Sequence, residues 1–73
     1  MLFGKVKKAI EDKESEIKLN LSNNYKDAAY SAFVELKNII EEYKSNGKIS
    51  DKDYDKLSLK IQDYEVKFSK MKS

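Results

Sequence analysis

A regular apolar stripe in the last third of the chain constrains its fold more than any other feature. Between residues 54 and 71, apolar side chains recur at spacings of three and four, a period that places them on one face of an α-helix. Residues 25–43 carry a second stripe, which Phe33 and Ile40 widen, so this helix should touch more than one neighbour. The two stripes predict an antiparallel helical hairpin, with helices at about 23–45 and 51–71.

The segment between these helices carries several independent turn signals. Gly47 suits the left-handed conformation just beyond a helix end. Ser50 is a favourable N-cap, and Asp53, three residues later, completes a capping pattern. Ile49 before the cap and Tyr54 four residues after it have the spacing of a hydrophobic staple. We therefore interpret these five residues as a structural turn.

The same turn can be aligned with the twelve-residue calcium loop of an EF-hand, running from Glu42 to Asp53. The third ligand position would then be Lys44, and an ammonium group cannot bind a cation. Asp51, Asp53 and Asp55 instead complement the dipole at the start of a helix. We expect no metal site and no cofactor.

The turn also resembles a known family. Gly47-x-Ile49-Ser50-x-x-Asp53-Tyr54 is similar to the pattern G-x-[IL]-[ST]-x-x-E-[FY] of the helical-hairpin modules called SHOCT domains, with Asp53 in place of the usual glutamate. That resemblance implies a role in association, usually as an appendage of a larger protein. The segment from Leu21 to Ala29, followed by this turn, is similar to small uncharacterised helical proteins of low-GC Gram-positive bacteria.

The first third of the chain predicts another helix, at about 5–19. Val6, Ile10, Ile17 and Leu21 follow helical spacing, but Lys13 and Glu14 interrupt their stripe. Residues 22–24 (Ser-Asn-Asn) are cap-forming types placed just before the second helix. A single helix running through to Tyr43 is the competing interpretation, because the apolar positions stay in phase.

The chain of 73 residues predicts one small all-α domain, 1–73, which resembles a three-helix bundle. Two helices alone rarely bury enough apolar area for stability. Either the first helix closes a monomeric bundle, or two hairpins form a four-helix bundle as a homodimer.

Composition narrows the function classes. The chain has no histidine or cysteine and shows no phosphate loop or nucleophile motif, so we expect it not to be an enzyme. It carries no secretory-signal pattern and no apolar run long enough to span a bilayer, which predicts a cytoplasmic protein. All 15 basic residues are lysine, and the absence of arginine argues against sequence-specific binding of nucleic acid.

These observations favour a non-catalytic protein–protein interaction module, structural or regulatory, whose partner is an unknown protein or a second copy. The predicted contact surface combines the N-terminal stretch with the broad face of the second helix: Leu2, Phe3, Val6, Ile10, Phe33 and Ile40. The alternative is binding to a membrane surface, or weakly to nucleic acid, through the lysine-rich ends. Those ends contain Lys5, Lys7, Lys8, Lys67, Lys70 and Lys72.

Overall fold

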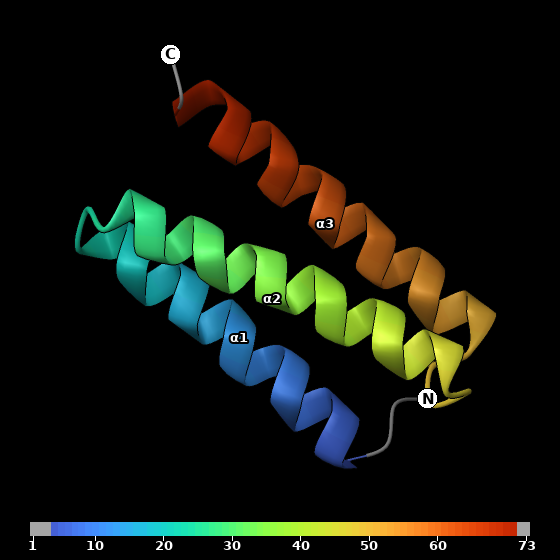
Figure 1. The fold of residues 1–73 in the computed structure, drawn as a ribbon. Helices are drawn as coiled ribbons and strands as arrows, with labels where there is room; N and C mark the ends of the chain where they lie inside the picture. Colours follow the sequence, from blue (N-terminus) through green and yellow to red (C-terminus); the bar gives the residue numbers. More distant parts are fainter. Residues whose placement is uncertain (1–3, 72–73) are drawn as a thin grey trace.

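The computed structural model describes residues 4–71, and within them the chain forms three α-helices and no strand (Figure 1). Helix α1 spans Gly4–Ser22, α2 spans Lys26–Ser45 and α3 spans Asp51–Met71. The all-α prediction is confirmed. Helix α3 has the predicted bounds, whereas α1 runs on to Ser22 and α2 begins only at Lys26.

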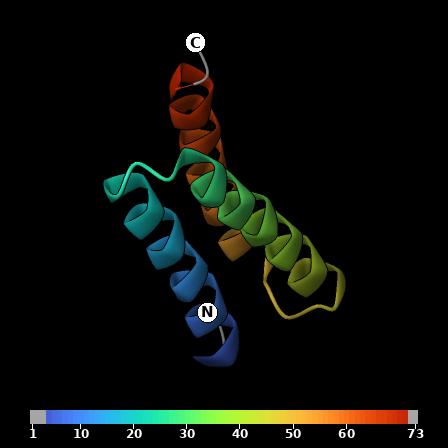
Figure 2. The ribbon, with the colours of Figure 1, turned by 60° about the vertical axis from the view of Figure 1, so that its left-hand side comes forward.

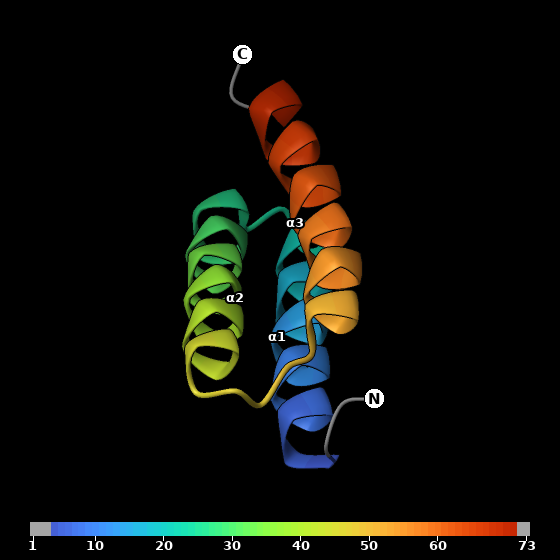
Figure 3. The same ribbon diagram turned by 90° about the vertical axis from the view of Figure 1, so that its right-hand side faces the viewer.

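Helix α2 packs against both other helices and is joined to them at opposite ends (Figure 1); in Figure 3 it stands to the left of α1 and α3. The backbones of α1 and α2 run close together, and α3 approaches α2 less extensively. Within residues 4–71, no Cα atom of α1 comes within 8 Å of a Cα atom of α3. The broad apolar face of α2 therefore serves two neighbours, as predicted.

One apolar core holds the three helices together. Helix α2 supplies the largest share of its buried side chains, α1 supplies three, and α3 supplies Leu57 and Phe68. The buried set is Val6, Ile10, Ile17, Ala29, Ala32, Phe33, Leu36, Ile40, Ile49, Leu57 and Phe68. Each pair of helices is also linked by an ion pair near the surface.

The interruption of the α1 stripe at Lys13 has a structural explanation. The ammonium group of Lys13 pairs with the carboxylate of Glu35 on α2 and, at 3.0 Å, with that of Glu16 on its own helix. Its aliphatic stem can cover apolar surface while its charge stays in water. Lys13 thus occupies a position of the α1 stripe without placing an unpaired charge in the core.

The break between α1 and α2 is complete, so the single long helix is ruled out. Figure 2 shows a short link at the upper end of the pair. Asn24 adopts a left-handed conformation with φ of 65°. The amide N–H of Tyr25 donates to the carbonyl of Asn20 at 2.8 Å, and that of Asn24 donates to Leu21 at 3.1 Å. These are the two hydrogen bonds of a Schellman motif, which ends α1.

This geometry corrects the expected capping of α2. The residue at the N-cap is Tyr25, and no side chain there accepts a capping hydrogen bond. Asn24 serves the end of α1 instead, and Ser22 is still inside α1. The physical reason is that asparagine favours both an N-cap and a left-handed position beyond a helix end, so residue type alone does not separate the two roles.

The turn between α2 and α3 matches the sequence prediction. Gly47 has φ of 73°, and its N–H donates to the carbonyl of Lys44 at 3.1 Å. The N–H of Lys48 donates to Tyr43 at 2.9 Å, which completes a second Schellman motif. Ser50 Oγ then accepts a hydrogen bond from the N–H of Asp53 at 3.2 Å and caps α3.

Candidate interaction surfaces

The structure places the predicted contact residues mostly inside the molecule. Val6, Ile10, Phe33 and Ile40 are each at most 4% exposed and belong to the core. Packing of the three helices covers them, with Phe33 against Tyr64 and Phe68 of α3, so they form no surface in this conformation of the chain. Leu2 and Phe3 lie outside the described residues.

The predicted turn residues form a compact cap around the start of α3. Ile49 is buried and Tyr54 packs against the same core, as expected of a hydrophobic staple. The Tyr54 hydroxyl donates to the Glu41 carboxylate, with oxygen separations of 2.5 and 2.8 Å. This hydrogen bond, together with partial burial, raises the pKa of the Tyr54 phenol above its ordinary value.

Lys44 occupies the position that the calcium alignment would assign to a ligand. Its ammonium nitrogen lies 2.6 Å from Asp51 Oδ1 and 5.7 Å from the centre of the Tyr54 ring. The hydrogen bond to Lys44, followed by its charge, lowers the pKa of Asp51. Across residues 4–71, no cluster of three or more acidic side chains is arranged to hold a metal ion.

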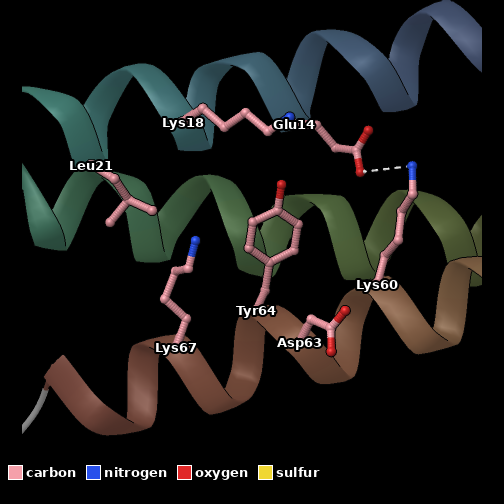
Figure 4. Close-up of a pocket in the computed structure, with 7 residues that line it drawn as sticks. All are labelled: Glu14, Lys18, Leu21, Lys60, Asp63, Tyr64 and Lys67. Carbon is pink, nitrogen blue, oxygen red and sulfur yellow. Dashed lines mark ion pairs between the residues drawn. The ribbon is translucent and has the colours of Figure 1, made fainter.

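An open groove of about 280 Å³ separates α1 from α3 (Figure 4). One ion pair crosses it, from Glu14 Oε1 to Lys60 Nζ at 3.4 Å. The Tyr64 ring rises from α3 toward α1, and burial, followed by the charge of Glu14, raises the pKa of its phenol. The remaining lining residues are Lys18, Leu21, Asp63 and Lys67. Because charges of both signs alternate there, the groove favours no single class of ion.

Aromatic side chains fill the contact between α2 and α3. The Phe33 ring centre lies 5.2 Å from that of Phe68 and 5.9 Å from that of Tyr64. Tyr30 meets Phe68 edge to face at 5.5 Å. Lys37 lies over the Phe33 ring at 5.4 Å and pairs with the Glu65 carboxylate at 3.1 Å. Edge-to-face and tilted arrangements of this kind are the favourable ones for aromatic pairs.

A groove runs along this contact on the side away from α1. On α2 its rim follows residues 30, 34, 37 and 41, which helical spacing places in one row. Three of these residues contact α3, through Phe68, Glu65 and Tyr54 respectively. On α3 the rim includes Gln62 and Ser69. The groove is therefore bounded by side chains of both helices.

Apolar side chains are also exposed away from the core. Val34 is 38% exposed and Tyr30 is 42% exposed on α2, while Leu59 is 63% and Val66 is 55% exposed on α3. Leu59 and Val66 lie seven positions apart, so they share one side of α3. We call Leu59 and Val66 the outer face.

The sequence analysis missed the outer face, although a signal for it was present. At about 100° per residue, Leu59 and Val66 lie roughly 160–180° around the helix axis from Leu57 and Phe68. Two apolar residues seven positions apart, opposite a core stripe, form a second and narrower stripe on the same helix. The main apolar stripe predicted the core side of this helix, and Leu59 and Val66 were not interpreted.

No helix within residues 4–71 has the length and apolar character needed to cross a membrane. Comparison with protein-family models, with curated proteins and with solved structures gave no match for this chain.

Proposed function

We propose that this chain is a non-catalytic association module that binds a protein partner through the outer face. The observation that carries the proposal is the exposure of two apolar side chains, Leu59 and Val66, on the side of α3 opposite its core stripe. Removing apolar surface from water is favourable by roughly 25 cal/mol per Å², so covering these side chains favours binding of a partner without any catalytic step. The resemblance of the turn to SHOCT modules points to the same kind of role.

The proposal includes a cytoplasmic location in a bacterial cell. The absence of cysteine from the sequence supports a reducing compartment, and hence the cytoplasm. The resemblance to proteins of low-GC Gram-positive bacteria supports a bacterial source. Both expectations concern where a partner would be met.

The outer face supports association better than the lysine-rich N-terminal stretch supports membrane binding. A helix that lies on a membrane needs its apolar side chains free to enter the lipid. Val6 and Ile10 would supply that face, and both are 3% exposed because they pack in the core.

Site-specific photocrosslinking in the cells that produce the protein tests the proposal. A photoreactive phenylalanine analogue replaces Val66 in one variant and Leu19 in another. Leu19 is the control because it is also exposed, at 63% against 55% for Val66, but lies on α1. We expect one partner species, identified by mass spectrometry, to be linked at position 66 and not at position 19. Equal labelling at both positions, or none at position 66, contradicts the proposal.

A further inference from the structure

We infer that Asn46 is a deamidation site and that the folded turn between α2 and α3 controls the reaction. An asparagine loses its side-chain amide most readily when glycine follows it, because glycine has no Cβ to hinder the approach of its own backbone nitrogen. Among the five asparagines of the chain, only Asn46 precedes a glycine. Both Asn46 and Gly47 are exposed, and the space beside Gly47 where a side chain would stand is open.

The reaction needs only water. The backbone nitrogen of Gly47 loses its proton and forms a bond to Cγ of Asn46. The bond from Cγ to the side-chain nitrogen breaks, and that nitrogen takes up a proton and leaves as ammonia. Water then opens the resulting succinimide ring at one of its two carbonyl carbons. Opening at Cγ gives aspartate, whereas opening at the backbone carbonyl gives isoaspartate, in which the main chain runs through Cβ.

Two features of the folded turn oppose the first step. Asn46 has ψ of 4°, so the backbone nitrogen of Gly47 eclipses that of Asn46 and lies away from the side chain. Ring closure requires a large rotation about the Cα–C bond of Asn46, which would displace everything that follows. The N–H of Gly47 also donates to the carbonyl of Lys44 at 3.1 Å, and that of Lys48 donates to Tyr43 at 2.9 Å. The turn must therefore open before the ring can close.

The products do not fit the closed turn. Asn46 is the C-cap of α2, and a carboxylate there adds negative charge at the negative end of the helix dipole. Isoaspartate also adds a main-chain carbon between residue 46 and Gly47, inside the Schellman motif that ends α2. Deamidation therefore weakens the hairpin, and a turn that has reacted closes less readily than before.

Peptide mapping by mass spectrometry tests the site. The full chain is incubated at mildly alkaline pH, and the mass gain from NH2 to OH is followed at each asparagine. In guanidinium chloride, which unfolds the chain, Asn46 should react faster than the other four, which are Asn20, Asn23, Asn24 and Asn38. Gly47→Ala should slow the reaction there, because no turn remains and only the added Cβ differs. Without denaturant the rate at Asn46 should fall at least about tenfold, because only molecules with an open turn react.

A matched pair of serine variants tests control by the turn. Ser50→Ala removes the hydroxyl that accepts a hydrogen bond from the N–H of Asp53 at 3.2 Å and caps α3 beside the turn. It should raise the rate at Asn46 several-fold in the folded chain, because a lost N-cap favours opening. Ser69→Ala, at an exposed position elsewhere on α3, should leave the rate unchanged. In guanidinium chloride both variants should react like the original chain, and circular dichroism confirms that both keep their helices in buffer.

Three results would overturn the inference. They are another asparagine that reacts as fast as Asn46 in denaturant, an equal rate at Asn46 with and without denaturant, and equal rates in the folded Ser50→Ala and Ser69→Ala chains. Urea unfolding of the deamidated chain tests the effect on the hairpin. We expect a lower urea midpoint than that of the original chain, and an unchanged midpoint would show that the products fit the turn after all.

Discussion

Replacement of Gly47 by alanine should destabilise the protein through backbone strain alone. Gly47 has φ of 73°, and a Cβ atom added there meets no heavy atom within 4 Å. The left-handed conformation costs an L-residue roughly 1–2 kcal/mol. Alanine also reduces the entropy of the unfolded chain, which returns roughly 0.4–1 kcal/mol. The net loss should be about 1 kcal/mol in the free energy of unfolding.

Urea and thermal unfolding followed by circular dichroism measure this loss. In a domain of this size, about 1 kcal/mol lowers Tm by roughly 4–8 °C. Gly47→Asn should lose less than the alanine variant, because asparagine already occupies the same conformation at Asn24, where φ is 65°. An alanine variant as stable as the original chain, or an asparagine variant that loses as much as alanine, refutes the strain argument.

Two further predictions concern the core and the turn. Phe33 is 1% exposed and contacts three aromatic rings, so Phe33→Ala should lose roughly 3–5 kcal/mol in urea unfolding, while Val34→Ala, at an exposed neighbour, should change stability by less than about 0.5 kcal/mol. A similar loss for both would contradict the core assignment. The lowered pKa of Asp51 means that its pairing with Lys44 stabilises the fold above the carboxyl group's ordinary pKa of 3.8, and that this contribution is lost as the pH falls through the folded-state value. Lys44→Met should therefore flatten the acid side of a plot of urea midpoint against pH. Lys52→Met removes an exposed lysine that does not contribute to the lowered pKa of Asp51, so it should leave the slope of that plot unchanged.

Local signals in the sequence predicted α3 and its turn in detail. The glycine and serine signals at Gly47 and Ser50 act on backbone groups within a few residues of themselves, and the apolar stripe belongs to one helix. These signals can therefore be recognised without knowledge of the rest of the fold. The role of Lys13 depends on Glu35, a residue of another helix, and no local pattern shows that pairing. The role of Asn24 was misassigned because two local rules favour the same residue type.

Local sequence patterns do not show whether an apolar helix face belongs to the core or to an interface. The sequence predicts that Val6, Ile10, Phe33 and Ile40 are apolar and share helical faces, which is equally true of a core and of an interface. Packing of the three helices assigns them to the core. Leu59 and Val66 of α3 are among the apolar side chains that remain exposed, and they become informative only once the core has been assigned.

The unequal spacing of the helices follows from the size of the side chains on α2. Helix α2 buries two alanines, Ala29 and Ala32, and Ala32 lies three positions before Glu35, whose pairing with Lys13 shows which side of α2 faces α1. Small side chains on that side allow the two backbones to approach closely. The row that faces α3 begins with Tyr30 and is backed by Phe33, whose rings hold that helix farther away. Large side chains therefore fill the α2–α3 contact, but they do not let its two backbones approach as closely as the alanines allow between α1 and α2.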